Sequence, residues 1–465
     1  MNTGLLLALL EAGLVVGFGI YAFATRKDRL LLASIALLLS FVSSSSFNNA
    51  TAAILGFSAL WPIILLSGFV IHTYFKLDPF RYSLAGRWIW IPLAIAIIYL
   101  FCVWPWFLYS SASLRRALAY LLVFLIGWFI VGRAITKDQD RIYETIRTIV
   151  LVIALVGFAQ ALVEFFLSAG SLTNIQEGNT TQIGSLEVRR LKATIHFTGL
   201  GYMLVLAFFG QINLGQRTNR SWVKKLSYGT MPVSFSLLLL TGSRGPLLTF
   251  FVLILVYLGI VFLNKSYNRK TRTIAFVALL TIIVLPFILW GTFVKPYILA
   301  RLPVEDLDEF SLIKVFYYSR LSNIAEIVLY ALELGYNPIL GAGPKASILI
   351  AESGWLLSDF PIESYIPRMI FEWGIVGGLL YIFSTLMILW ETIRLEAEER
   401  RAGDRTAWLL TIYMLIPWIS SITSYGLSTV DGNLILVYAI GAAASTANIL
   451  RKKEKKKIAS WGTNG

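Results

Sequence analysis

Apolar runs of about twenty residues recur along almost the whole chain, and this repetition limits what the chain can fold into. A helix needs about 20 apolar residues to cross a bilayer core of about 30 Å. Hydrophobic residues make up 57% of the 465 residues and charged residues only 14%, a composition that excludes a water-soluble domain of this length. We therefore predict an all-α polytopic membrane protein.

The apolar runs predict about thirteen transmembrane helices, within a range of about 12 to 14. They fall at 4–24, 30–47, 52–75, 88–108, 114–134, 146–168, 197–215, 226–241, 246–263, 273–293, 374–393, 407–425 and 432–450. The first run is expected to remain as a span, because no basic residue precedes it and Glu11 interrupts it. The single cysteine, Cys102, lies within a predicted span, so disulfides are not expected.

Lysine and arginine gather in short connections, and these predict the orientation of the chain. The connections 216–227 and 264–272 and the tail 451–457 are strongly basic, so the positive-inside rule places them in the cytoplasm. The net charge of +14 is then a matter of topology and of attraction to anionic lipid, and nucleic-acid binding is not expected. Alternation of the spans makes the N-terminus and these segments extracytoplasmic: 43–51, 169–196, the turn that holds Arg244, 294–373 and 424–433.

The spacing of the spans divides the chain into four parts. They are a transmembrane bundle of about ten helices (1–293), a large extracytoplasmic loop (294–373), three final transmembrane helices (374–450) and a basic cytoplasmic tail (451–465). A loop of this length within a compact membrane domain has room for a folded lid. Within it, residues 308–338 have apolar residues at helical spacing with interleaved charges, which predicts amphipathic helices on the outer interface that end at Gly335 and Pro338.

The stretch LTGSRGPLL (240–248) places Arg244 on the side of the membrane where the positive-inside rule disfavours it. One interpretation is an arginine that snorkels to lipid phosphate. The other is an anion site, because Gly242 and Gly245 allow close approach to the backbone and Pro246 suits the first position of a helix whose N–H groups attract anions. Arginine, glycine and a helix start together favour a phosphate or diphosphate site.

Two further outer segments repeat this combination of basic residues and glycines. The stretch SLEVRRLKATIHFTGLG (185–201) brings Arg189 and Arg190 to the outer end of a helix, either as a solvated basic loop or as part of an anion site. The stretch GAGPK (341–345) has glycines followed by proline and a basic residue. It is either a plain turn or another anion site, with Gly341, Gly343 and Lys345 as its candidate residues.

The large loop ends with DFPIESYIPRMIFEWGIVGG (359–378), which leads into the next span. Pro367 is expected to open a helix, so that Arg368 and Glu372 lie one turn apart, a spacing that favours a salt bridge. Glu363 has no equally evident partner. It is either a solvated loop residue or a general base.

Taken in order, these motifs resemble the superfamily of O-antigen ligases and Wzy-type O-antigen polymerases, over residues 185 to 450. The resemblance begins with RLKATIHFTGLG before a span, in which ten residues separate Arg190 from Gly201, as in outer loops of Wzy polymerases. It continues with TGSRG between two spans and with SRLSNIAEIVLYALELGYNPILGAGP in a large outer loop. A motif at the loop exit and three final helices complete it.

The resemblance implies a GT-C-like enzyme of the bacterial inner (plasma) membrane, with its active site on the extracytoplasmic side. Such enzymes transfer a glycan from undecaprenyl diphosphate to a sugar hydroxyl and use no metal, nucleotide or other cofactor. The implied partners are an undecaprenyl-diphosphate-linked glycan as donor and acceptor, membrane lipid, and a chain-length regulator and a flippase of the same pathway. The resemblance also implies that Arg190, Arg244 and Arg320 bind the diphosphate. Arg189 is an alternative to Arg190, and Arg368 is a candidate without a counterpart in the family.

The loop exit departs from the ligase pattern at one residue. Ligases carry a histidine there, proposed as the general base, whereas this chain has Glu363, followed by Ser364, Gly374 and Gly377 at the ligase spacing. A carboxylate can accept the proton of an acceptor hydroxyl, so Glu363 is the predicted catalytic base. The departure favours a polymerase, which joins one lipid-linked repeat to another, over a ligase.

Two alternative functions stay open. One is ligase-type transfer to a lipid A core or another acceptor. The other is a transporter or flippase for lipid-linked sugars or a small anion, a class that shows repeated halves, broken helices and ionisable groups near the bilayer midplane. The chain has no convincing internal repeat, and Glu11 and Glu164 are the only acids well within predicted spans. Charges gathered at one membrane face favour surface chemistry over transport.

Overall fold

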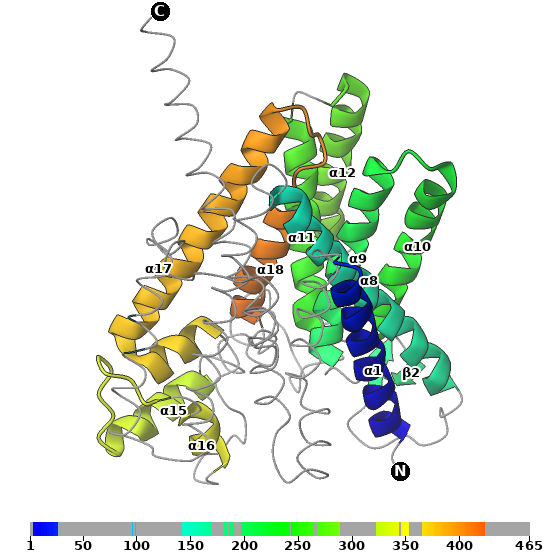
Figure 1. The fold of residues 1–465 in the computed structure, drawn as a ribbon. Helices are drawn as coiled ribbons and strands as arrows, with labels where there is room; N and C mark the ends of the chain where they lie inside the picture. Colours follow the sequence, from blue (N-terminus) through cyan, green and yellow to red (C-terminus); the bar gives the residue numbers. More distant parts are fainter. Residues whose placement is uncertain are drawn as a thin grey trace, which may run out of the picture.

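The computed structural model describes residues 3–26, 95, 98, 142–169, 180–183, 186–189, 197–241, 243–264, 267–288, 322–343, 346–352 and 365–423. Within these ranges the chain is almost entirely helical, as Figure 1 shows. The helices are α1 (Thr3–Ala24), α8 (Ile142–Ala169), α9 (Phe197–Arg217), α10 (Ser221–Leu240), α11 (Arg244–Leu263), α12 (Arg269–Ile288), α15 (Ser322–Glu333), α16 (Ala346–Glu352), α17 (Tyr365–Arg401) and α18 (Leu409–Thr423).

Three of the described helices contain a segment long and apolar enough to cross a membrane. These segments are Ile146–Val163 in α8, Gly245–Leu263 in α11 and Ile366–Arg401 in α17. Each overlaps a predicted span, so the prediction of a helical membrane protein is confirmed for this part of the chain. Four predicted spans lie outside the described residues, as does most of a fifth: 30–47, 52–75, 114–134, 432–450, and 88–108 apart from residues 95 and 98.

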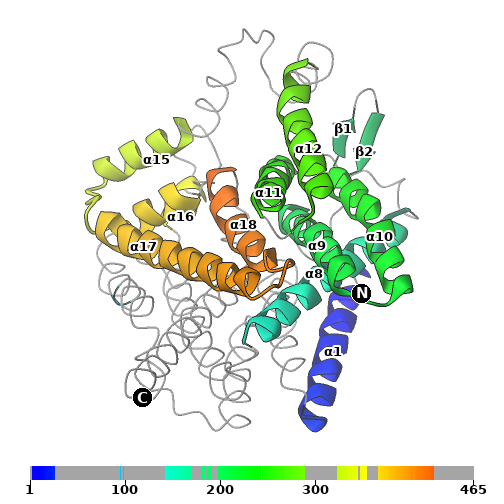
Figure 2. The ribbon, with the colours of Figure 1, turned by 90° about the horizontal axis from the view of Figure 1, so that it is seen from above.

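Helix α9 forms the centre of the described bundle. It packs against α8, α10, α11 and α18, which surround it in the view along the bundle in Figure 2. Close packing against α8 depends on Gly157, where a Cβ atom would lie 2.6 Å from Cβ of Met203. The buried polar side chains of α9 have partners on neighbouring elements, since Gln211 accepts a hydrogen bond of 3.0 Å from Ser234 on α10. A buried helix can carry polar side chains when they have such partners.

A short two-stranded antiparallel sheet adds to the predicted all-α fold. Strands β1 (Thr180–Ile183) and β2 (Leu186–Arg189) pair in the connection between α8 and α9, with Thr180 opposite Arg189 and Ile183 opposite Leu186. The physical reason is local, because Gly-Ser between two short stretches with β-branched residues is a hairpin signal. Strands of four residues are too short to appear as apolar runs of about 20 residues.

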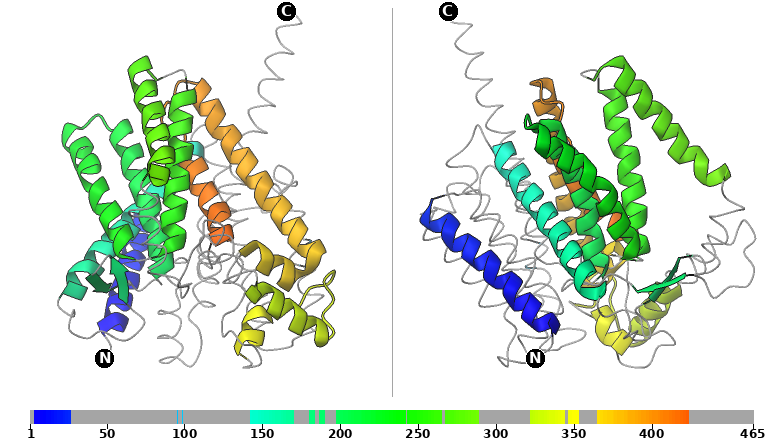
Figure 3. Two further views of the ribbon diagram at one scale, coloured as in Figure 1. Left: turned by 180° about the vertical axis from the view of Figure 1, so that it is seen from behind. Right: turned by 90° about the vertical axis from the view of Figure 1, so that its right-hand side faces the viewer.

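The described helices have two distinct ends, which both views of Figure 3 separate. At the basic end lie the connections from α9 to α10 and from α11 to α12, which belong to the basic segments 216–227 and 264–272, together with the connection from α17 to α18. At the loop end lie β1, β2, α15, α16 and the start of α11. Figure 1 also shows the N-terminus of α1 at the loop end. The described helices thus run between these two ends, and the assignment of the basic end to the cytoplasm stays a prediction.

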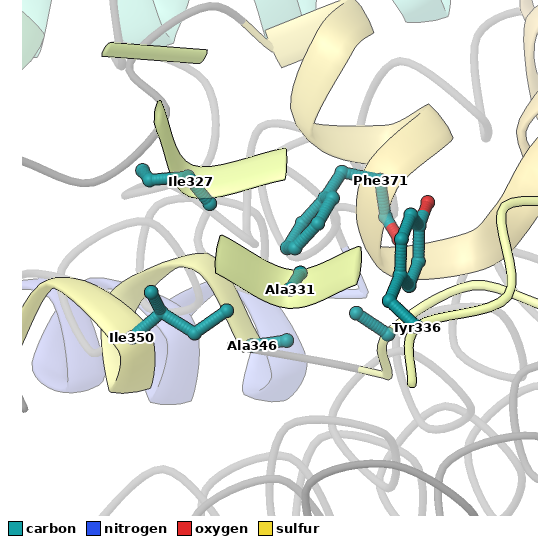
Figure 4. Packing of buried hydrophobic residues seen from close by; sticks show 7 residues of the cluster. Ile327, Ala331, Tyr336, Ala346, Ile350 and Phe371 are labelled. Atoms are coloured by element: carbon teal, nitrogen blue, oxygen red, sulfur yellow. The ribbon is translucent and has the colours of Figure 1, made fainter. Parts of the chain in front are cut away.

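Helices α15 and α16 and the first turns of α17 form a small unit with its own apolar core at the loop end. Figure 4 shows this core, which consists of Ile327, Ala331, Tyr336, Ala342, Ala346, Ile350 and Phe371. The rings of Tyr336 and Phe371 have centroids 4.9 Å apart. Helix α15 ends as predicted, because Gly335 adopts a φ of 87° and the amide of Tyr336 donates back to the carbonyl of Ala331 at 2.9 Å.

Helix α17 is broken near its start. Gly374 has φ 70° and ψ 172°, which are not helical values, and it divides α17 into a short first part and a long apolar second part. The sequence predicted two helical pieces here, one opened by Pro367 and a span beginning at Gly374. The helix begins at Tyr365, two residues before Pro367, because proline is compatible with the first turn, where amides need no helical acceptor.

Candidate functional site

Two of the predicted outer motifs are in direct contact. A Cβ atom on Gly201 of α9 would lie 2.7 Å from Cγ of Pro246 on α11 and 3.5 Å from Oγ1 of Thr241. Only glycine allows this approach, because real Cβ atoms essentially never come so close to another side chain. The helix that follows Arg190 in the sequence therefore starts beside the turn that holds Arg244.

The turn between α10 and α11 is tightly built and buried. Thr241 has no exposed surface; its hydroxyl donates to the carbonyl of Leu238 at 2.7 Å and accepts from the amide of Ser243 at 3.4 Å. Ser243 is the N-cap of α11, with an extended backbone and no side-chain cap hydrogen bond. Gly245 is buried directly after Arg244. The first turn of a long apolar helix is thus presented at the loop end, with Arg244 as its first residue.

The position of Pro246 corrects one prediction. Pro246 was expected at the first position of the helix, but α11 begins two residues earlier, at Arg244. Proline is tolerated here because the amides of the first turn lack acceptors within the helix, so its missing N–H removes no helical hydrogen bond. Consequently Arg244 belongs to the helix itself, where the macrodipole favours an anion.

The last two predicted motifs also meet, at a junction of backbone against backbone. Gly341 has φ 92°, and a Cβ atom on it would lie 2.3 Å from the amide nitrogen of Gly374. The amides of Ala342 and Gly343 donate to the carbonyls of Phe371 and Glu372 at 2.9 and 2.8 Å. The turn after α15 therefore pairs with the break in α17.

This pairing bears on the two interpretations of GAGPK. Its amides at Gly341, Ala342 and Gly343 all donate to backbone carbonyls, and Gly343 also has a positive φ of 90°. Amides already bound to carbonyls do not bind an anion, so the structure favours a turn at residues 341–343. Gly377, the other glycine of the loop-exit motif, is buried within α17.

Arg368 and Glu372 form the predicted salt bridge, and it is buried. Nε of Arg368 lies 2.8 Å from Oε1 of Glu372, and the two side chains are 1% and 0% exposed. The hydroxyl of Ser347 on α16 donates to the same carboxylate oxygen at 3.1 Å. Ser347 carried no sequence signal. Burial and pairing favour a structural role for Arg368, in which it stabilises the packing of α17 on α16, over the predicted contact with diphosphate.

Most of the predicted ligands of the diphosphate fall outside what the structure describes. Arg189 ends strand β2 and Arg244 begins α11, but their side chains are not described. The remaining predicted residues lie outside the described ranges: Arg190, Gly242, Arg320, Lys345, Glu363 and Ser364. Among the described residues, no group of three His, Cys, Asp or Glu side chains is arranged to hold a metal ion.

A polar cluster at the basic end was not predicted. Arg217 at the end of α9 forms ion pairs with Glu144 of α8, at 2.5 Å, and with Asp404, and its Nε donates to the hydroxyl of Thr406 at 2.5 Å. Glu144 also pairs with Arg147. We call these five residues the Arg217 cluster. The spacing of Glu144 and Arg147 was a usable local signal, whereas the contacts of Arg217 span 73 and 187 residues of sequence.

The Arg217 cluster predicts a dependence of stability on pH. Burial by itself raises the pKa of the Glu144 carboxyl, but hydrogen bonds from Arg217 and Arg147 outweigh burial and hold the pKa below its ordinary value of 4.5. This contribution to stability is present above pH 4.5 and is lost as the pH falls through the lower folded-state pKa. Its size is about 1 kcal/mol, because Glu144 is 36% exposed and solvent screens the pairs.

The measurement is the thermal unfolding midpoint in nanodiscs between pH 7 and pH 3, compared for the wild type and Glu144→Gln. The variant should be less stable at neutral pH and should lose less stability on acidification. Glu333→Gln, which replaces an exposed acid on α15, is the matched control and should follow the wild type. Equal acid sensitivity of Glu144→Gln and the wild type would contradict the prediction.

No protein-family profile matches the chain, and comparison with curated proteins finds no match. The resemblance to O-antigen ligases and Wzy-type polymerases therefore depends on the motifs alone. Two pairs of those motifs contact one another in the described part of the chain, through Gly201 with Pro246 and through Gly341 with Gly374.

Proposed function

We propose that the chain is a polyprenyl-diphosphate-dependent glycosyltransferase that polymerises lipid-linked oligosaccharide repeats on the outer face of a bacterial plasma membrane. One observation carries the proposal: Gly201 packs so closely against Pro246 that a Cβ atom on Gly201 would lie 2.7 Å from Cγ of the proline. This contact joins the second turn of the helix that follows Arg190 to the first turn of the helix that begins at Arg244. Two arginine motifs that are far apart in sequence thus have their following helices in contact at one end of the bundle.

The proposed reaction is an inverting displacement. The hydroxyl oxygen of the acceptor sugar attacks the anomeric carbon of the donor, and its proton passes to the carboxylate of Glu363. The bond between the anomeric carbon and the diphosphate oxygen breaks, and the diphosphate leaves on its lipid with both electrons of that bond. Arg190 and Arg244, with Arg320, stabilise the charge that develops on this leaving group, and the first turn of α11 adds its helix dipole. The proposal also includes the fold, with about thirteen membrane spans in a GT-C-like arrangement.

Product analysis of the purified protein tests the reaction. The protein in nanodiscs is given an undecaprenyl-diphosphate-linked repeat unit alone, and the glycolipids are resolved by gel electrophoresis and mass spectrometry. We expect a ladder of lengthening glycans on lipid diphosphate, together with released undecaprenyl diphosphate. A single transfer that requires an added lipid A core or protein acceptor would instead identify a ligase. Absence of any transfer with the native repeat would overturn the proposal.

Arg244→Ala tests the role of the start of α11. Loss of a fixed positive charge that stabilises the leaving diphosphate should lower the rate of transfer by about 100-fold or more. Arg220→Ala is the matched control, because Arg220 is an exposed arginine at the opposite, basic end and precedes α10 as Arg244 opens α11. The control should retain the wild-type rate. A normal rate for Arg244→Ala, at unchanged protein yield, would exclude the diphosphate role.

The break in α17 is the one observation that favours the second candidate, a transporter for lipid-linked sugars or a small anion. Transporters place ion and substrate sites at discontinuous helices. Gly374 interrupts a candidate span directly after the buried pair Arg368 and Glu372. That pair, however, lies in the first turns of α17, near the loop end of the bundle. Movement of labelled lipid-linked sugar across sealed vesicles, without glycan transfer, would support this candidate.

A further inference from the structure

Helix α15 is apolar over a wider arc than its packing requires. Ile327 and Ala331 are fully buried in the core of the loop-end unit (Figure 4). Ala325, Leu329 and Leu332 are exposed, the two leucines by 62% and 45%. At about 3.6 residues per turn these three residues form a second apolar stripe beside the buried one. The stripe therefore faces something other than the core of its own unit.

The charge of this region indicates the chemistry of what covers the stripe. The remaining side of α15 carries Glu326 and Glu333, and residues 322–343 contain no lysine or arginine. Attraction to anionic lipid headgroups therefore does not explain the exposed leucines, since that attraction needs basic residues. At a boundary between an apolar phase and water, the exposed leucines of α15 would lie in the apolar phase and its glutamates would face water.

The stripe is continuous with the lipid-facing side of a candidate span. Leu334, Ile339 and Leu340 follow it in the turn after α15 and are 51%, 57% and 42% exposed. The amide of Ile375 donates to the carbonyl of Pro338 at 2.9 Å, and this bond attaches the turn to α17. Beyond the bond, the exposed apolar surface continues along the span with Ile375, Val376, Leu379 and Phe383.

We infer that α15 and the turn 334–340 are embedded in the acyl chains of the membrane leaflet at the loop end of the bundle. In Figures 1 and 2 α15 lies at the loop end and runs across the direction of α9 and α11, as an interfacial helix does. The positive-inside rule makes this leaflet the outer one. The described part of the large loop is then a shelf in the membrane and does not act as a lid in water. This inference stands apart from the proposed reaction.

Spin labels at single cysteines test the shelf, because Cys102 is the only native cysteine and Cys102→Ser supplies a background without it. In nanodiscs, labels are placed by Leu332→Cys on the stripe and Ile339→Cys in the turn, and by Glu333→Cys and Asn337→Cys as matched exposed neighbours. Leu379→Cys, 56% exposed within the candidate span, is the reference for lipid. Collision rates with oxygen, which concentrates in lipid, and with a water-soluble nickel chelate are measured for each label.

The expected result is a severalfold higher ratio of oxygen to nickel collisions at Leu332→Cys and Ile339→Cys than at Glu333→Cys and Asn337→Cys, close to the ratio at Leu379→Cys. The same ratios should appear in nanodiscs without anionic lipid, because no basic residue of α15 contributes. Water-like ratios at both Leu332→Cys and Ile339→Cys would overturn the inference. Lipid-like ratios at all four positions would also overturn it, since the acidic side would then not face water. All five labelled positions are exposed, so no label replaces a buried side chain.

Discussion

Gly374→Ala is expected to destabilise the protein by about 3 kcal/mol or more, because a methyl group there meets both backbone strain and steric overlap. Gly374 has φ 70° and ψ 172°, a region that only glycine occupies without strain. A Cβ atom would also lie 2.3 Å from the carbonyl oxygen of Ile339 and 2.6 Å from the carbonyl carbon of Leu340. Both neighbours are backbone atoms, and hydrogen bonds to α17 fix that backbone, so they cannot move aside as a side chain would.

Gly335→Ala separates the two causes of this loss. Gly335 lies in the same loop-end unit and has φ 87°, but nothing lies within 4 Å of a Cβ atom there. The control therefore measures backbone strain without contact and should cost about 1 kcal/mol. Thermal unfolding of both variants in nanodiscs gives the comparison. If Gly374→Ala were no less stable than Gly335→Ala, the close junction between the turn and α17 would be wrong.

Glu372→Gln is expected to destabilise the protein by about 3–5 kcal/mol, because it breaks a buried ion pair by removing the charge of the carboxylate that contacts the guanidinium of Arg368. The amide keeps the size of the carboxyl group and can still accept a hydrogen bond from Ser347, so the change isolates charge from packing. Replacement of both members by apolar residues, as Arg368→Met with Glu372→Leu, should recover much of this loss. Unfolding midpoints of the single and double variants measure the difference.

The same helix supplies the matched control. Arg394 and Glu398 have the same spacing of four residues in α17, but their separation is 3.8 Å and their side chains are 32% and 18% exposed. Solvent screens such a pair, so Glu398→Gln should change stability by no more than about 1 kcal/mol. Similar losses for Glu372→Gln and Glu398→Gln would mean that burial of the Arg368 and Glu372 pair does not govern its contribution.

The residues of these predictions hold the end of the large loop against α17 and have no direct part in the proposed reaction. Gly374 and Gly341 join the end of the large loop to α17, and Arg368, Glu372 and Ser347 hold α16 against the same helix. A loss of glycan transfer in these variants would follow from loss of this packing. Arg244→Ala differs from them because it should lower transfer without lowering the unfolding midpoint, and the two measurements together distinguish support from chemistry.

Local periodicity was sufficient for the helices and for one contact. The apolar runs predicted α8 and α11 to within a few residues, because about 20 apolar residues in sequence already specify a membrane-spanning helix. The pair Arg368 and Glu372 was also predictable, since a spacing of four residues brings side chains together on any helix. The strands β1 and β2 also had a local signal, Gly-Ser between two short stretches with β-branched residues. They were not predicted, because strands of four residues do not form long apolar runs.

By itself, the sequence determined the class of the protein and the places of its helices, because both depend on the hydrophobicity of consecutive residues and on helical geometry. Only the tertiary structure decided which motifs meet: Gly201 with Pro246, Gly341 with Gly374, and Arg217 with Glu144 and Asp404. These contacts depend on how helices pack, and glycine or arginine at one position does not name its distant partner. The burial of Arg368, a candidate ligand of the diphosphate, was also decided by the tertiary structure, through the fold of the loop-end unit around it.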